Sequence, residues 1–454
     1  MGAQLSMRDS FRASPSPHVA VIGGGCAGLA AAASLGQRAI PITLFEANHQ
    51  LGGRARGINW KGHRLDNGQH ILLGAYSETL RLLTLAGVDL ENAVMRLPLQ
   101  LIMHGSLDLR AASHLPAPLH MLAGILQARG LNLAEKWAAL RFMAWLRGID
   151  FRLTEDENLL ALLTRKQQPQ KLTALLWGPL CLAALNTPLN QASAQIFLNV
   201  LRDSFSKSKT DSDMLLPRCD LSTLIADPVA AYIRRTGGQI LTNTTVTGLV
   251  QDSDGFLLDC DGRQSQRFSH VIIAVSPFRL AQLAQHLPAL AEVVHVCKKF
   301  SHQPIYTVYV QYPESVRLDN PMIGFTQGYG QWVFDRDLLC GQPGLLAVMI
   351  SAEGPHQKLT QEALAAEVIA QLATVFPALP QALWHKVVAE KRATFACTPN
   401  LQRPRQYTPI TNLYLAGDYT AGDYPATIEG AIRSGVTCAD HVILHTRLTH
   451  SISL

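Results

Sequence analysis

A short apolar run that leads directly into three spaced glycines constrains this chain more than any other feature. Residues 19–22 read Val-Ala-Val-Ile, and Gly23, Gly25 and Gly28 follow in a G-x-G-x-x-G pattern before an alanine-rich segment. This order predicts a buried strand, a tight turn and a helix. The first glycine permits the turn, the second lets the backbone approach a pyrophosphate, and the third lets the helix pack on the strand. The pattern therefore predicts dinucleotide binding.

An acidic residue ends the next apolar run. Residues 42–45 read Ile-Thr-Leu-Phe, and Glu46 follows eighteen residues after Gly28. A carboxylate at this place can accept both hydroxyls of an adenosine ribose, which favours a cofactor without a 2′-phosphate. A Gly-Gly-Arg run follows, in which Gly53 is the second glycine and Arg54 is the arginine. We interpret it as a second cradle for the pyrophosphate, because arginine pairs bidentately with phosphate oxygens; a glycine-rich surface turn is the alternative.

The composition excludes several classes of protein. With 454 residues, 48% of them hydrophobic and 16% charged, the chain is a well-buried globular protein that exceeds one typical core. A net charge of +5 does not mark a nucleic-acid binder. The eight cysteines are scattered without a C-x-x-C pair. This predicts reduced thiols, a cytoplasmic setting and no metal site.

Contact with a membrane is left open by the sequence. No uninterrupted apolar stretch reaches eighteen residues, so we expect no transmembrane helix, and we expect residues 1–17 to form a disordered tail. The segments 114–129 and 135–147 are amphipathic, and the second combines basic residues with Trp137 and Trp145. One interpretation is a peripheral contact with the inner face of the cytoplasmic membrane. The other is a pair of core-facing helices with a solvated basic face.

Two further motifs lie far apart in the chain. Residues 66–70 read Asp-Asn-Gly-Gln-His, a polar group between two hydrophobic runs. Near the other end, an apolar run ends at Gly417 and Asp418. Residues 425–435 follow as the entrance of a helix with close-packing glycines.

Taken in this order, the motifs resemble the flavin-dependent amine oxidase and carotenoid desaturase superfamily. The resemblance implies an α/β fold with a Rossmann-type domain that binds FAD, and that Asp418 contacts the ribityl chain. It also implies that the helix entrance faces the pyrimidine end of the flavin and that the Val246 backbone lies on the adenine side. We expect non-covalent FAD, because Cys397 lacks the glycine-rich setting of a flavin-linked cysteine. The implied cofactor-binding residues are Gly23, Gly25, Gly28, Glu46, Gly53, Arg54, Val246, Gly417, Asp418, Thr427, Ile428 and Ala431.

The same resemblance implies two interleaved domains. We expect a discontinuous FAD-binding domain from residues 18–89, 217–290 and 390–454. The substrate-binding domain would comprise residues 90–216 and 291–389, as a helical cap plus a mixed sheet. The segment 90–216 is rich in Leu and Ala and is predicted to be helical, with apolar walls that line a substrate cavity.

A narrower resemblance concerns the reaction. Segments 66–76, 177–188, 214–218, 332–336 and 390–399 are similar to the hydroxysqualene dehydroxylases, FAD enzymes of bacterial squalene and hopanoid synthesis. The resemblance implies that FADH2 supplies a hydride to hydroxysqualene, a long apolar isoprenoid, with release of water and formation of squalene. The partner that reduces the flavin is left unassigned.

Hydroxide leaves poorly, so this reaction needs a proton donor. The candidates are His70 and Asp335. The alternatives are structural: a satisfied histidine at a turn, and an acid paired with Arg336 or Arg392.

Two other functions stay open. An oxidative carotenoid-type desaturase or an amine oxidase would share every FAD motif and differ in the direction of electron flow. A flavin-containing isoprenoid carrier without turnover would share the apolar walls.

Overall fold

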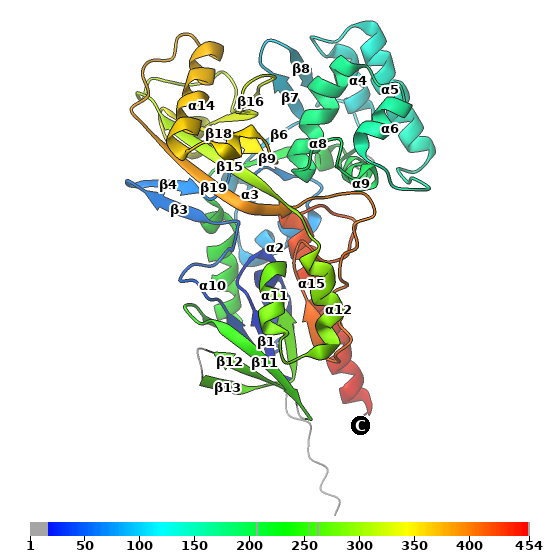
Figure 1. The fold of residues 1–454 in the computed structure, drawn as a ribbon, viewed down its shortest axis with the longest axis vertical. Helices are drawn as coiled ribbons and strands as arrows, with labels where there is room; N and C mark the ends of the chain where they lie inside the picture. The colour runs from blue at the N-terminus through cyan, green and yellow to red at the C-terminus, as the bar shows by residue number, and fades with distance from the viewer. Residues whose placement is uncertain (1–16, 206–207, 254, 261–262, 453–454) are drawn as a thin grey trace, which may run out of the picture.

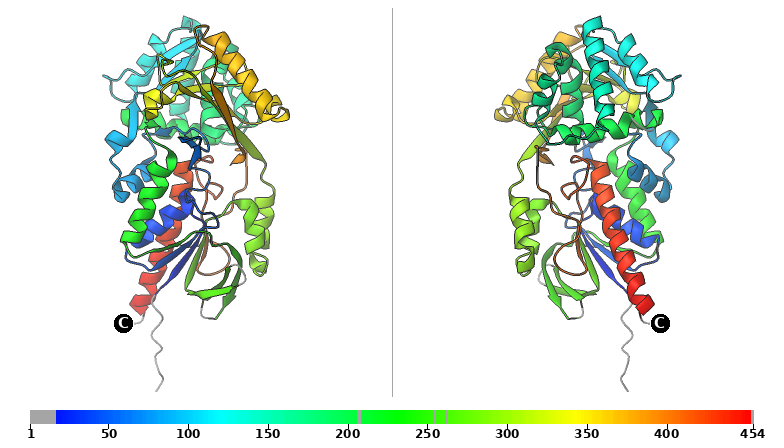
Figure 2. Two further views of the ribbon diagram at one scale, coloured as in Figure 1. Left: turned by 90° about the vertical axis from the view of Figure 1, so that its left-hand side faces the viewer. Right: turned by 90° about the vertical axis from the view of Figure 1, so that its right-hand side faces the viewer.

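A computed structural model describes residues 17–205, 208–253, 255–260 and 263–452 of the chain. Residues 1–16 of the predicted tail lie outside this range. The molecule has two parts, one around a parallel sheet and one around a second sheet with a helical cap (Figure 1). Each part mixes segments from early and late in the sequence, and the side views show the same division (Figure 2).

A five-stranded parallel sheet organises the first part. Its central strand pairs on one side with the strand that ends at Phe45 and on the other with the strand that begins at His270. The carboxyl end of the central strand, with its glycine turn, therefore lies at the middle of the sheet. The strands in spatial order are β10 (Gln239–Leu241), β2 (Ile42–Phe45), β1 (Val19–Ile22), β14 (His270–Ile273) and β20 (Leu413–Leu415).

Both faces of this sheet are covered, which explains its continuous apolar strands. Val19 and Val21 face the helices, whereas Ala20 and Ile22 face the opposite side, as the two-residue period of a strand requires. A three-stranded antiparallel sheet covers that opposite side (Figure 2). It comprises β11 (Val246–Asp252), β12 (Gly255–Cys260) and β13 (Arg263–Phe268). The helices of this part are α1 (Cys26–Gly36), α2 (Ser77–Ala86), α3 (Leu90–Ala93), α10 (Asp227–Arg235), α11 (Pro277–Leu283), α12 (Ala291–Lys298) and α15 (Ile428–Ile452).

A seven-stranded mixed sheet organises the second part. Two long strands, β15 (His302–Gln311) and β19 (Trp384–Phe395), run down from this sheet toward the first part (Figure 1). The strand β19 crosses the domain boundary expected at residue 390. The remaining strands, in order after β15, are β18 (Leu345–Ser351), β17 (Trp332–Asp335), β16 (Met322–Gly324), β7 (Gln100–Met103) and β8 (Leu107–Arg110).

Helices and small sheets complete the second part and its junction with the first. The helices of the cap gather beside β7 and β8, and α14 packs against the long strands (Figure 1). The helices are α4 (Leu119–Gln127), α5 (Leu133–Gly148), α6 (Leu159–Arg165), α7 (Gln170–Leu172), α8 (Gly178–Leu185), α9 (Ala194–Phe205), α13 (Arg336–Cys340) and α14 (Gln361–Val375). The small sheets are formed by β3 (Gly57–Trp60) with β4 (His63–Asp66), and by β5 (Leu72–Leu73), β9 (Met214–Pro217) and β6 (Val94–Leu97).

The prediction that residues 90–216 are helical is wrong for the first part of that segment. The strands β6, β7 and β8 lie there, and β7 pairs with β16 of the second sheet. Leu101, Met103, Leu107 and Leu109 are buried at alternate positions. This two-residue period is the signal of a strand, and the high content of leucine obscures it.

Candidate functional site

Two glycine loops face each other beyond the carboxyl end of β1. Gly23 has a φ of +111°, and a Cβ on Gly28 would lie 1.9 Å from the Gly23 carbonyl oxygen. Gly25 is different: its backbone is extended, and a Cβ there would meet only the Cα of Gly53, at 4.0 Å. Gly25 also forms a parallel bridge with Gly52. The two loops therefore leave bare backbone and open space where a pyrophosphate could approach.

Glu46 lies where β2 ends, beside the glycine turn. Its carboxylate is buried and accepts hydrogen bonds from the backbone N–H groups of Gly24, at 2.7 Å, and Asn48, at 2.8 Å. The backbone of Thr244 donates to the Glu46 carbonyl, which brings the start of β11 at Val246 to the same corner. The two residues expected on the adenosine side thus lie together.

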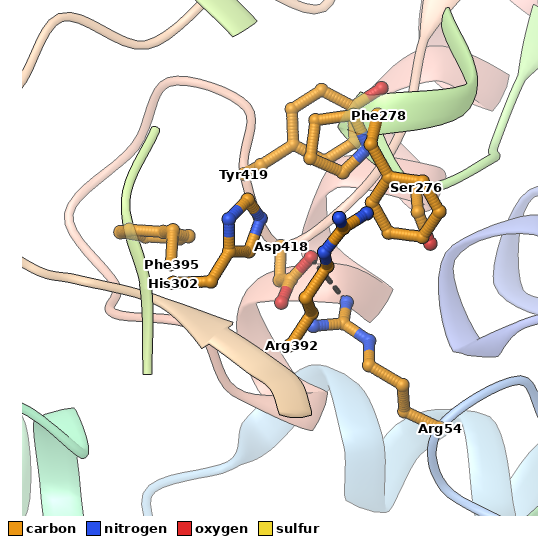
Figure 3. Close-up of a pocket in the computed structure, with 9 residues that line it drawn as sticks. Arg54, Ser276, Phe278, His302, Arg392, Phe395, Asp418 and Tyr419 are labelled. Atoms are coloured by element: carbon orange, nitrogen blue, oxygen red, sulfur yellow. Dashed lines mark hydrogen bonds and ion pairs between the residues drawn. The ribbon is translucent and has the colours of Figure 1, made fainter. Parts of the chain in front are cut away.

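Arg54 and Asp418 join the two ends of the chain. The Arg54 Nη2 lies 2.7 Å from the Asp418 Oδ1, and its Nη1 donates to the Ala393 carbonyl (Figure 3). Asp418 directly follows Gly417 at the end of β20 and is buried. This ion pair lies where the glycine loops and β20 meet.

A small cavity adjoins this ion pair. His302 points toward Asp418, and the Arg392 guanidinium lies 4.7 Å from the centre of the Phe278 ring (Figure 3). Burial, together with Arg392 and Arg54, lowers the pKa of His302. The buried hydroxyl of Tyr419 has no hydrogen-bond partner among the described residues. The cavity is lined by Arg54, Ser276, Pro277, Phe278, His302, Arg392, Phe395, Asp418 and Tyr419.

Sequence reasoning missed most of these lining residues. His302 and Phe278 belong to no glycine or acidic motif, and the sequence suggests Arg392 only as a partner for Asp335. Tyr419 carried one available signal, since it follows Asp418 directly in the chain.

The N-terminus of α15 is capped at the expected place. The Thr427 hydroxyl accepts a hydrogen bond from the Gly430 N–H, and the Ala431 N–H donates to the Thr427 carbonyl. Ile428 is the first residue of the helix. A 25-residue helix gives this end a partial positive charge that can stabilise an electron-rich ligand edge.

These residues fit a dinucleotide such as FAD. The glycine loops supply backbone at the pyrophosphate, Glu46 supplies a ribose acceptor, and Arg54 supplies a cation. The unpartnered Tyr419 hydroxyl offers an additional polar contact. No group of three or more His, Cys, Asp and Glu side chains in the described ranges is arranged to hold a metal ion.

His70 lies in a loop held by a buried ion pair. Its Nδ1 lies 2.6 Å from the Gly68 carbonyl oxygen, which can only accept, so the Nδ1 carries the hydrogen and donates. Burial is the main cause that lowers the pKa of His70, and Arg54 adds to it. At the end of β4, directly before this loop, the Asp66 Oδ2 lies 3.1 Å from the Arg336 Nη1, with both side chains buried.

The Asp335 carboxylate has a structural role. Its carboxylate is buried and accepts three backbone N–H groups, from Asp337 and Leu338 at the start of α13 and from Leu318. Arg336 pairs with Asp66, so neither arginine partner considered for Asp335 is observed. We therefore assign Asp335 to capping α13 and do not retain it as the proton donor.

An apolar cavity of about 140 Å³ lies inside the helical cap. Its walls come from α4, α5, α8, α9, the strands β7 and β8 and the helical turn that ends at Trp177. Arg147 is the only charged residue among its described lining residues. The lining comprises Leu99, Leu101, Leu109, Pro118, Met121, Leu122, Ile125, Leu140, Met143, Ala144, Arg147, Leu176, Trp177, Leu180 and Phe205.

Comparison with known proteins identifies the kind of site. A family model described as flavin containing amine oxidoreductase matches residues 26–443. A hydroxysqualene dehydroxylase of Sinorhizobium fredii is 26% identical over 94% of this chain and 99% of its own length. A hydroxysqualene dehydroxylase of Rhodopseudomonas palustris is 29% identical over 94% of this chain and 98% of its own length. A 15-cis-phytoene desaturase of Solanum lycopersicum is 26% identical over 96% of this chain and 80% of its own length.

A solved structure shows the same fold. A putrescine oxidase triple mutant superposes with a TM-score of 0.72 at 16% identity, over 94% of this chain and 99% of that one. The α/β fold, the resemblance to the amine oxidase and desaturase superfamily, and the FAD cofactor are therefore confirmed.

Proposed function

The chain belongs to the flavin containing amine oxidoreductase family, and from this premise we propose that it reduces hydroxysqualene to squalene. In this reaction a C–O bond breaks, a C–H bond forms and water leaves. The observation that carries the proposal is the apolar cavity in the helical cap. Among the described residues that line it, only Arg147 is charged. Two relatives that match over nearly their full length, named hydroxysqualene dehydroxylase, support the same substrate.

The flavin, when bound in its reduced form, supplies the hydride. The chain must hold the substrate hydroxyl and supply a proton. We propose His70 for this role, because its Nδ1–H is engaged with the Gly68 carbonyl, so that its Nε2 is the ring nitrogen available to exchange a proton. A neutral imidazole accepts a hydrogen bond from the hydroxyl at Nε2, and protonation converts Nε2 into the donor.

An anaerobic experiment tests the proposed reaction. The flavin of the purified holoenzyme is photoreduced, hydroxysqualene is added, and oxidised-flavin absorbance and product mass are followed together. We expect the absorbance to return as squalene forms. A reduced flavin that stays reduced with hydroxysqualene would contradict the dehydroxylase function, and binding of hydroxysqualene without any oxidation would indicate a carrier.

The second candidate is an oxidative desaturase. The similarity to a 15-cis-phytoene desaturase over 96% of this chain favours it over other oxidases. Bleaching of the oxidised holoenzyme by a polyene, with no response of the reduced enzyme to hydroxysqualene, would establish this alternative.

We further propose that α4 and α5 rest on a membrane surface. Leu133 is 83% exposed and Trp137 is 68% exposed, and Leu126 is exposed on the neighbouring helix. The cations Lys136 and Arg141 belong to the same helix as Leu133 and Trp137. Exposed apolar side chains beside cations favour an anionic lipid surface. None of the helices within the described ranges has both the length and the hydropathy needed to cross a bilayer.

Flotation with vesicles tests this contact. With anionic phospholipid vesicles, the native holoenzyme is expected to float, and a Leu133→Ser/Trp137→Ser variant is expected to stay in the dense fraction. Leu383→Ser is the matched control, since Leu383 is also exposed but lies directly before β19, outside the helical cap. Equal flotation of the double variant and the native chain would count against the contact.

A further inference from the structure

One helix of the cap contacts both the apolar cavity and the segment that leads into the flavin-facing end of α15. Phe205, the last residue of α9, lines the cavity. Asp203 lies two positions before Phe205, so the two side chains point in nearly opposite directions from the helix. Asn199 lies one turn before Asp203 and shares its face of α9. Figure 1 shows α9 at the edge of the cap nearest the N-terminal end of α15.

The second face of α9 is bonded to residues 423–424. The Asn199 amide donates to the Asp423 carbonyl at 3.1 Å. The Tyr424 hydroxyl donates to the Asp203 carboxylate at 2.8 Å, and the Arg202 Nη2 lies 3.5 Å from the Asp423 carboxylate. These two hydrogen bonds and one ion pair hold residues 423–424 against α9.

The contacts continue from Tyr424 into α15. The Arg433 guanidinium lies 4.8 Å from the centre of the Tyr424 ring, and its Nε donates to the Glu429 carboxylate at 2.7 Å. Glu429 is fully buried in the first turn of α15. Its carboxylate also accepts the N–H groups of Glu78 and Thr79 at the start of α2. A continuous series of contacts thus joins the cavity wall to the helix end that Thr427 caps.

We propose that α9 couples filling of the apolar cavity to the state of the flavin, with Asp203 and Tyr424 as positioning residues. A ligand that moves Phe205 shifts α9, and the bonds to residues 423–424 carry that shift to the first turn of α15. This inference rests on the proposed function in one respect, namely that the cavity takes an isoprenoid chain. Because coupling between two sites is reciprocal, the redox state of the flavin must then change the affinity of the cavity by the same factor.

The test uses the holoenzyme and squalane, a saturated isoprenoid that cannot react. The Kd of squalane is measured from tryptophan fluorescence, to which Trp177 of the cavity contributes, with the flavin oxidised and with it reduced. We expect the two Kd values to differ about fivefold or more. In Tyr424→Phe, which loses only the hydroxyl bonded to Asp203, the ratio is expected to fall toward one. Tyr232→Phe in α10 is the matched control and is expected to keep the native ratio.

The outcomes separate this inference from the proposed function. If squalane binds but the native ratio is one, or if Tyr424→Phe keeps the native ratio, the coupling is wrong and the proposed function stands. If squalane does not bind the native holoenzyme, both the substrate assignment and the coupling fail. Asn199→Asp, which removes the donor to Asp423, gives a second variant if Tyr424→Phe does not fold, and the same fall in the ratio is expected from it.

Discussion

The Arg54 Nη2 lies 2.7 Å from the Asp418 Oδ1, which joins two residues 364 positions apart in the sequence. Arg54 follows the second glycine loop, and Asp418 follows the last strand of the parallel sheet. The pair therefore forms only when both ends of the chain have assembled the sheet. It also concentrates opposite charges at the place where a dinucleotide would cross the sheet edge.

Arg54→Met is expected to weaken FAD binding about ten- to hundredfold, because a hydrogen bond to a charged group contributes about 1.5–3 kcal/mol. The measurement is the Kd of FAD by fluorescence quenching. Arg56→Met is the matched control: Arg56 belongs to the same loop, and no ion pair to it is present among the described residues. Equal losses in both variants would indicate disruption of the loop rather than loss of a specific contact.

Gly25→Ala is expected to fold normally and to bind FAD at least about tenfold more weakly. Without a ligand, the added Cβ meets only the Gly53 Cα at 4.0 Å, and the extended backbone accepts alanine. With a ligand, that Cβ occupies the space needed by the pyrophosphate. Thermal unfolding of the flavin-free protein and FAD titration separate the two effects.

Gly28→Ala provides the contrast. Its Cβ would lie 1.9 Å from the Gly23 carbonyl oxygen, so α1 must move away from β1. We expect loss of soluble folded protein from this variant. A Gly25→Ala protein that unfolds as readily as Gly28→Ala would contradict the assignment of open space beside Gly25.

The parallel sheet could be predicted from the sequence because each of its signals is local. Four apolar residues before Gly23 and an acid directly after Phe45 specify strands and their ends without knowledge of the rest of the chain. The Arg54 and Asp418 positions were likewise predicted from motifs, although their contact depends on the assembled sheet.

The remaining site residues could not be predicted because their positions depend on long-range packing. His302 and Arg392 lie on strands of the second part and reach the cavity only because β15 and β19 extend toward the first part (Figure 1). For Asp335 the sequence shows an acid among aromatic residues. It does not show that Leu318, seventeen residues earlier, supplies one of three N–H donors.

Dehydroxylation is expected to become faster as pH falls from 8 to 6, if His70 supplies the proton. Burial lowers the pKa of His70, so the imidazole is mostly neutral at neutral pH, and the protonated fraction rises as the pH falls. The measurement is kcat/KM against pH.

The variant His70→Gln is expected to remove this pH dependence and to lower kcat/KM about 10²–10⁴-fold. His104→Gln is the control, since His104 is exposed at the end of β7. A His70→Gln profile with the native slope would exclude His70 as the donor.

The flavin is expected to leave the protein on acid precipitation. Cys397, the cysteine considered for a covalent link, is buried, and burial raises the pKa of its thiol to about 12. Its backbone N–H donates to the Thr187 hydroxyl of the cap. A buried neutral thiol is a poor nucleophile. Native protein and Cys397→Ser should both give a yellow supernatant, and flavin retained in the native pellet alone would refute the prediction.

Acidification below about pH 6.5 is expected to destabilise the fold through His270. This histidine is buried in β14, with its Nε2 at 3.3 Å from the Nδ1 of His445. Burial, and then the neighbouring His445, lowers the pKa of His270 to about 4. His270 therefore takes up a proton near pH 6.5 in the unfolded chain but only near pH 4 in the folded chain. The free energy of unfolding is unaffected above pH 6.5 and falls between these two values.

The loss has an upper bound of about 3.5 kcal/mol, since each unit of pKa shift corresponds to about 1.4 kcal/mol. Urea unfolding measured from pH 8 to pH 4.5 checks this loss. The readout is the slope of the free energy of unfolding against pH rather than its absolute value. His270→Gln is expected to flatten the slope, because no proton is taken up at this position on unfolding. His49→Gln, at an exposed position after β2, is expected to keep the native slope. If His270→Gln and the native chain lose stability equally over this range, other buried groups cause the acid sensitivity.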